Sequence, residues 1–228
     1  MRPQESLFLL VAMWTGYDRV YAGCEPKRGV PSKTTTPPPA ALAAEAASDP
    51  KVHGKAVVDF WREAGPSMWF AKDPAFDRRF RETFSSLYEA AARGKLAHWL
   101  QQPESALALI LLLDQYPRNS FRGTPRMYAT DALARQMTSA AVAAGHDRAI
   151  EVPLRLFVYL PYGHSEDLAD QERSVELSEN VNAHSVERAK HHRDIVRRFG
   201  RFPHRNAILG RQSRPEELRY LAEGGYAG

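Results

Sequence analysis

The sequence LALILLL at residues 107–113 decides the fold. It follows Pro103, a residue that suits the first turn of a helix but not its interior. Seven apolar residues in a row leave no polar face, and in a helix this indicates burial on all sides. We therefore predict that this run forms the central helix of the domain.

Helical patterns extend on both sides of this run, and no segment offers a partner strand. Asp73-Pro74 combines a capping residue with a proline at the first helical position, and the helix after it has an apolar face with Phe76 and Phe80. Further helices are expected from Val57 to Gly65, over 96–100, from Thr124-Pro125 to Gly145, over 153–160, after a Ser165 cap, over about 186–199, and after a capping box at 213–216. The pattern predicts an all-α domain of successive antiparallel helix pairs, as a bundle or a short stack.

The first part of the chain has a different composition. Residues 34–39 read TTTPPP, which favours polyproline II, and the alanine-rich residues 40–47 carry little apolar bulk. Such a segment buries too little apolar surface to fold by itself. We predict a disordered or weakly ordered extension over residues 1–52 and one all-α domain over residues 53–228.

Cys24 is the single cysteine of the chain, so no disulfide can form within it. An apolar run followed by Ala22-Gly23-Cys24 resembles the end of a lipoprotein export signal, but Asp18 and Arg19 interrupt that pattern. No apolar run is long enough to span a membrane. We expect a cytoplasmic protein, with export through Cys24 as the alternative.

Charge is unevenly distributed along a chain whose formal net charge is +4. Residues 184–214 contain nine Lys or Arg and two acids, whereas residues 160–183 contain six acids and one Arg. The basic segment could form a nucleic-acid patch. The alternative, which we favour, is that an acidic and a basic helix neutralise each other. We therefore expect no nucleic-acid partner.

The histidines of this region suggest a metal site, but their spacing does not support one. His184, His191 and His192 share a helical face at intervals of seven and eight, whereas helical zinc ligands are usually three or four residues apart. His191 and Asp194 have that spacing, but nothing supplies an obvious third ligand. We expect no metal and no cofactor.

Three segments combine hydrogen-bond donors with residues that end helices. They read FGRFPHRN at 199–206, DQYPRN at 114–119 and HSE at 164–166. No Gly-x-Ser-x-Gly elbow accompanies Ser165, so a serine nucleophile is not expected. Because turns at one end of a helical stack lie on one rim, we predict that the segments form one polar cleft. The candidate residues are Asp114, Arg118, Asn119, His164, Glu166, His192, Arg201, His204, Arg205 and Asn206; a purely structural network is the alternative.

Several longer motifs together resemble the domain-of-unknown-function 924 family, an uncharacterised and mainly bacterial family. The matching motifs are VDFW at 58–61, WFAKDPAFD at 69–77, LLDQYPRN at 112–119, FRGT at 121–124, HSEDL at 164–168, HRDI at 192–195 and residues 199–206. The resemblance spans about residues 56–226. It implies an all-α fold of the tetratricopeptide-like helical superfamily, which is a right-handed stack of antiparallel helix pairs. It implies no activity, substrate or cofactor.

The sequence leaves two function classes open. The first is a binding module whose arginines hold a small anionic ligand or a protein partner in the cleft. The second is an enzyme that uses His164, Glu166 or His204 for proton transfer in the same cleft. We take the binding module as the leading interpretation and the enzyme as the alternative.

Overall fold

A computed structural model describes residues 50–228 of the protein, with side chains from residue 52 onward. The predicted extension up to residue 49, the export motif and Cys24 lie outside the described residues. Helix α4 (Pro50–Ala64) begins within the last residues of that extension. All regular elements of the described part are helical and none is a strand, which confirms the all-α class. The right-handed tetratricopeptide-like stack stays a prediction.

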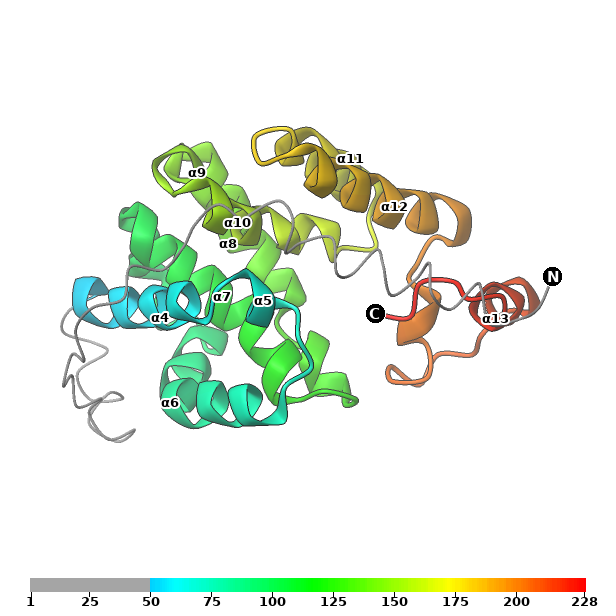
Figure 1. Cartoon of the computed structure of the whole chain (residues 1–228), viewed down its shortest axis with the longest axis horizontal. Coiled ribbons are helices and arrows are strands. Elements are labelled where there is room, and N and C mark those ends of the chain that lie inside the picture. The colour runs from blue at the N-terminus through cyan, green and yellow to red at the C-terminus, as the bar shows by residue number, and fades with distance from the viewer. Residues whose placement is uncertain (1–49) are drawn as a thin grey trace.

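The helices follow one another with short connections (Figure 1). After α4 come α5 (Pro66–Trp69), α6 (Pro74–Ala92), α7 (Pro103–Ser120), α8 (Asp131–Ala143), α9 (His146–Ala149), α10 (Val152–Gly163), α11 (Leu168–Ser178), α12 (Ala183–Phe199) and α13 (Pro215–Ala222). Short 3-10 helices occur at η1 (Ala97–Gln101), η2 (Pro125–Tyr128) and η3 (Pro203–Arg205). Within residues 50–228, no helix is both long enough and apolar enough to span a bilayer.

Helix α7 is the central helix, as the apolar run predicts. Every residue from Ser105 to Pro117 is buried, and α4, α6, α8 and α10 pack around the helix. Gly54 allows α4 to approach closely, because a Cβ at this position would lie 3.0 Å from Ser105 Cβ. Trp61 and Phe80 are fully buried in the aromatic core beside α7. This core packs against α7 and α10, the helices whose ends carry the candidate residues Asp114 and His164.

The predicted caps were correct at the start of α6 but wrong further along the chain. The carboxylate of Asp73 accepts hydrogen bonds from the backbone N–H groups of Ala75 and Phe76, both at 2.8 Å. Thr124 caps no long helix, because 125–128 forms a 3-10 turn and α8 begins only at Asp131. The same helix was expected to run to Gly145, and it ends at Ala143.

The caps of the acidic helix and the C-terminal helix also differ from the prediction. Asp167, not Ser165, caps α11, and its carboxylate accepts from Ala169 N at 2.8 Å. At α13 the N-cap is Arg214, and Glu217, rather than Glu216, accepts from its backbone N–H. At α11 local sequence does not rank Ser165 and Asp167, because both are favoured capping residues. At α13 local preference would favour Ser213 over Arg214, and the contacts of Glu217 hold Arg214 at the cap position.

The acidic helix α11 packs beside the basic helix α12, as the charge pattern predicts (Figure 1). Glu172 of α11 accepts a hydrogen bond from Arg197 and forms an ion pair with Arg193 at 3.6 Å. Asn182 caps α12, which begins at Ala183, three residues earlier than expected. The arginines of this face are thus paired within the protein.

A second, smaller apolar cluster holds the C-terminal part of the described chain. Ile195, Val196 and Phe199 of α12 pack with Phe202, and Tyr220 and Tyr226 cover them. Gly200 ends α12 with a φ of 70°, a left-handed conformation that favours glycine. The chain therefore turns sharply after α12 and carries residues 201–206 back toward α7 and α10.

Candidate functional site

The first group of candidate residues lies inside α7, not in a turn after it. The prediction placed Asp114, Arg118 and Asn119 in a turn that follows the buried helix. Pro117 lies inside α7 and lacks the N–H that would bond the Leu113 carbonyl. The helix continues to Ser120 because Thr130 Oγ1 donates to the Leu113 carbonyl at 2.6 Å instead. Asp114 and Arg118 therefore project from the last two turns of α7.

Asp114 is the centre of a buried polar cluster. Its carboxylate accepts hydrogen bonds from His164 Nδ1 at 2.8 Å and Gln115 Nε2 at 2.7 Å, and Arg118 Nη1 lies 3.1 Å away. Burial opposes the charge of this carboxylate, but Arg118 and His164 outweigh burial and lower the pKa of Asp114 to about 2. Asp114 is therefore ionised near neutral pH.

His164 is the C-cap residue of α10 and meets Asp114 across the space between two helix ends. Because an ionised carboxylate only accepts, Nδ1 of His164 carries the proton and Nε2 keeps a free lone pair. Burial lowers the pKa of His164, and the charge of Arg118 lowers it further, although Asp114 opposes both. The imidazole is thus neutral near pH 7 and oriented by Asp114.

Asp131, the first residue of α8, links the α7 end to the turn after α12. It accepts a bidentate pair of hydrogen bonds from Arg118, at 2.8 and 3.0 Å. Arg205 Nη1 donates to the same carboxylate at 3.3 Å. Burial lowers the pKa of Arg205, and the charge of Arg118 adds to this effect. The partly buried Arg118 and the buried Arg205 thus share one aspartate.

Glu166 and His204 lie on the other side of Arg205. Glu166 accepts from Arg211 at 2.6 and 2.9 Å and from the Phe202 N–H at 2.7 Å. Burial raises the pKa of Glu166, but these partners outweigh burial and lower it. Burial and the charge of Arg205 lower the pKa of His204 to about 3, so His204 is neutral near pH 7.

The remaining candidate residues form separate contacts. Arg201 and Asn206 both donate to the buried Glu217 of α13. Asn119 donates to Asp77 at 2.7 Å, on the α6 side of α7. His192 is buried, with its ring 5.7 Å from that of Phe202, and burial lowers its pKa well below the usual value. The structure therefore links Asp114, Arg118 and His164 directly and Arg205 to them through Asp131, with Glu166 and His204 near Arg205, and gives the others mainly structural contacts.

Three residues of this cluster were not among the predicted candidates, namely Asp131, Tyr128 and Arg211, and Glu217, which accepts from Arg201 and Asn206, was missed as well. Asp131 fell inside the helix expected from Thr124 to Gly145, where a single charged residue usually indicates only the solvent-facing side of a helix. Tyr128 packs its ring 4.6 Å from the Arg205 guanidinium. These contacts join residues that are far apart in the chain, so local spacing carries no signal for them. Within the described residues, no three His, Cys, Asp or Glu side chains gather as a metal site would require.

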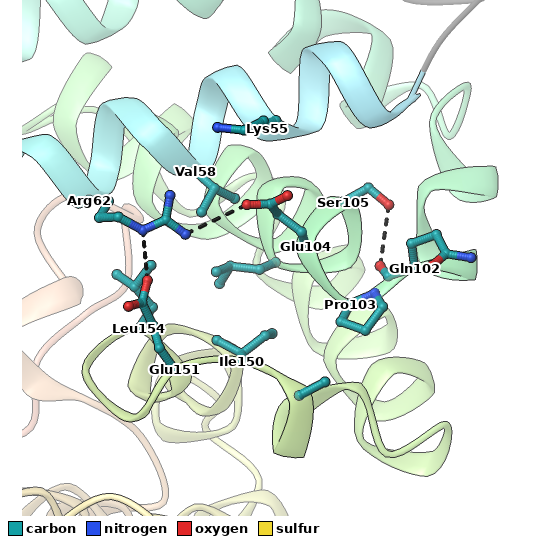
Figure 2. A pocket seen from close by; sticks show the side chains of 12 residues that line it. Lys55, Val58, Arg62, Gln102, Pro103, Glu104, Ser105, Ile150, Glu151 and Leu154 are labelled. Carbon is teal, nitrogen blue, oxygen red and sulfur yellow. Dashed lines mark hydrogen bonds and ion pairs between the residues drawn. The ribbon is translucent and has the colours of Figure 1, made fainter.

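A cavity of about 590 Å³ lies in another part of the molecule (Figure 2). It is bounded by α4, the start of α7 and the α9–α10 corner, and its lining includes none of the ten candidate residues. Its floor is formed by the buried Val58, Leu107, Ile150 and Leu154, and charged side chains surround it. Sequence reasoning gave no sign of this cavity.

Comparisons with known proteins agree with the motifs. Residues 57–225 match the family described as "Bacterial protein of unknown function (DUF924)". A solved structure of a protein of unknown function from Agrobacterium tumefaciens is 52% identical, with a TM-score of 0.76, and the match covers 77% of this chain and 100% of that one. None of the curated proteins matches this chain. The chain therefore belongs to the DUF924 family of bacterial proteins of unknown function.

Proposed function

We propose that the cluster around Arg205 binds a small anionic ligand, such as a carboxylate or a phosphate. The coordination of Arg205 carries this proposal. Its side chain is buried, yet within the described residues it makes one hydrogen bond, of 3.3 Å, to Asp131. Its Nε has no partner there. Buried donors in native proteins almost always have an acceptor, so this guanidinium is suited to receive one from a ligand.

The surroundings of Arg205 support the same proposal. The Nδ1 atom of His204 and the Nε atom of Arg211 are also buried and without a partner within residues 50–228. The rings of Tyr128 and Phe202 pack 4.6 and 4.7 Å from the guanidinium carbon of Arg205. These rings restrict the guanidinium, so that a ligand would bind through its N–H groups. Arg205 and Arg118 share Asp131 and repel each other, and a bound anion would offset that repulsion.

Thermal unfolding with small anions tests this function. Phosphate, sulfate, acetate and malonate are compared with chloride at equal ionic strength, for the wild type, Arg205→Gln and Arg197→Gln. Arg197 lies on the exposed face of α12, paired with Glu172, and is the matched control. A ligand present at about 100 times its Kd stabilises the folded state by about 2.7 kcal/mol, which is readily measured as a higher Tm.

We expect at least one anion to raise the Tm of the wild type and of Arg197→Gln, but not of Arg205→Gln. Arg205→Gln should unfold without ligand at nearly the wild-type temperature, because it gives up one long hydrogen bond and relieves a repulsion. Two results together would establish a structural network instead. The first is that no anion raises the Tm of the wild type. The second is that Arg205→Gln lowers the free energy of unfolding by about 1–3 kcal/mol, which is the cost of leaving buried partners unpaired.

The Asp114–His164 hydrogen bond favours a second candidate function, an enzyme with His164 as general base. A neutral imidazole with Nδ1 held by a carboxylate presents the lone pair of Nε2 for proton abstraction. Nitrophenyl acetate and nitrophenyl phosphate are simple probes for acyl and phosphoryl transfer. Turnover that falls about a hundredfold or more in His164→Gln would support the enzyme. Turnover that is unchanged by this substitution would contradict it.

A further inference from the structure

We infer that residues 224–228 form a strap that closes the Arg205 cluster and must move aside before a ligand enters it. The strap follows α13, which ends at Ala222. Figure 1 shows the chain leaving α13 and running back toward the connection between α5 and α6. The closed position of the strap rests on contacts within the protein, whereas its role in ligand entry rests on the proposed function.

The ring of Tyr226 is the part of the strap that reaches the cluster. Its centroid lies 4.8 Å from that of the His192 ring and 5.1 Å from that of the His204 ring. Both histidine rings contact the ring of Phe202, which lies 4.7 Å from the guanidinium carbon of Arg205. A single layer of aromatic side chains therefore separates Tyr226 from Arg205.

The backbone of the strap lies against His204. A Cβ built on Gly228 would lie 3.1 Å from Cδ2 of His204 and 3.4 Å from its Nε2. The other ring nitrogen of His204, Nδ1, is buried and has no partner within residues 50–228. The unpaired Nε of Arg205 is buried as well, so a ligand reaches it only if a covering segment moves.

Few hydrogen bonds hold the strap within the part of the chain that the structure describes. The N–H groups of Gly225 and Tyr226 donate to the carbonyl and the hydroxyl of Tyr220, both at 2.9 Å. Lys72 Nζ donates to the Gly228 carbonyl at 3.4 Å, which is a long hydrogen bond. Three of the five strap residues are glycines, which lose more conformational entropy on ordering than any other residue. Since α7 and α10 belong to the main core, the strap is the covering segment that costs least to detach.

Gly224 and Gly225 form the turn that brings the strap back onto the histidines. Gly224 has a φ of 85°, in the left-handed region that favours glycine. A Cβ on Gly225 would lie 2.5 Å from Cε1 of Tyr220, so a larger residue fits there only if the strap or this ring shifts. Gly225→Val should therefore displace the strap while it keeps Tyr226.

Chemical labelling of histidines tests the strap on the full chain without any ligand. Diethyl pyrocarbonate acylates imidazole rings, and mass spectrometry of tryptic peptides gives one rate for His204 and one for the exposed His98, the internal reference. We expect Tyr226→Ala and Gly225→Val each to raise the ratio of the His204 rate to the His98 rate about tenfold, because each releases the aromatic contacts of Tyr226. Leu218→Ala, on the exposed face of α13, is the matched control and should keep the wild-type ratio.

Two results of the labelling would overturn the strap. The first is a ratio that both strap variants leave unchanged. The second is a His204 rate in the wild type that equals the His98 rate, because a closed strap protects His204.

A binding measurement separates the strap from the function proposed for Arg205. Calorimetry compares the wild type and Tyr226→Ala with whichever of phosphate, sulfate, acetate and malonate raises the wild-type Tm. We expect a Kd about tenfold lower in Tyr226→Ala, because no covering segment has to be displaced. An unchanged or higher Kd in this variant would overturn the role in ligand entry. A raised His204 ratio without anion binding to either protein would refute the proposed function, and with it that role, while the closed strap stands.

Discussion

Replacing Asp114 with asparagine should remove the charge on which the buried cluster depends. Asp114 is 1% exposed and contacts His164, Gln115 and Arg118. Asparagine has the same shape but no charge, so it leaves His164 and Arg118 with a weaker acceptor. Arg118 keeps its bidentate contact with Asp131, which limits the damage.

The magnitude follows from the pKa of Asp114, which folding lowers from 3.8 to about 2. At about 1.36 kcal/mol for each pH unit, the ionised carboxylate contributes on the order of 2 kcal/mol to the free energy of unfolding near neutral pH. Loss of one partner from a buried ion pair typically costs about 3–5 kcal/mol. Since Arg118 retains Asp131, we expect Asp114→Asn to lower the free energy of unfolding by about 2–3 kcal/mol.

Urea unfolding at pH 7, followed by tryptophan fluorescence, measures this loss. Asp194→Asn is the control, because Asp194 is exposed and, within residues 50–228, pairs with two arginines of its own helix, Arg193 and Arg197. Such exposed pairs contribute about 0–1 kcal/mol. A free energy of unfolding within about 0.5 kcal/mol of the wild type in Asp114→Asn would refute the role assigned to Asp114.

The pH dependence provides a second check with a defined sign. Because folding lowers the pKa of Asp114, its contribution is complete above the unfolded value of about 4 and is lost as the pH falls toward about 2. The difference in unfolding free energy between wild type and Asp114→Asn should therefore shrink between pH 4 and pH 2. A difference that stays constant over this range would show that the charge of Asp114 is not what stabilises the fold.

Three further predictions concern local structure and surface charge. Asp73→Ala should lower the free energy of unfolding by about 1 kcal/mol, because it removes the cap of α6, and an unchanged urea midpoint would contradict this. Gly200→Ala should cost about 1–2 kcal/mol, since its φ of 70° is unfavourable for a residue with a Cβ, whereas Gly200→Asn should cost less. Non-specific duplex DNA should not bind at physiological salt in fluorescence anisotropy, because Glu172 already pairs with Arg193 and Arg197; micromolar binding with a steep salt dependence would refute this.

The sequence by itself determined the helices and the element at the centre. Helix formation depends on contacts three and four residues apart, and burial of α7 follows from an apolar run without a polar face. The Asp73 cap is equally local, since the side chain bonds backbone groups two and three residues later. The acidic and basic helices were also paired correctly, because they are consecutive and a short connection keeps them adjacent. The cap predicted at Ser165 failed because Asp167, two residues later, is an equally good local candidate. At Thr124 a 3-10 turn precedes α8, and at residues 213–216 the cap shifts by one residue to Arg214.

The tertiary structure alone decided which polar groups meet. Asp131 joins Arg118, 13 residues before it, to Arg205, 74 residues after it, and Pro117 remains helical while Thr130 donates to the freed Leu113 carbonyl. The cavity likewise exists only where α4, α7 and α10 come together. In each case the contacts join groups that are neighbours in space but not in sequence. No pattern of spacing along the chain therefore encodes these contacts. The sequence could name Arg205 as a candidate, but only the fold shows that this buried arginine has one long hydrogen bond and an unpaired Nε within the described residues.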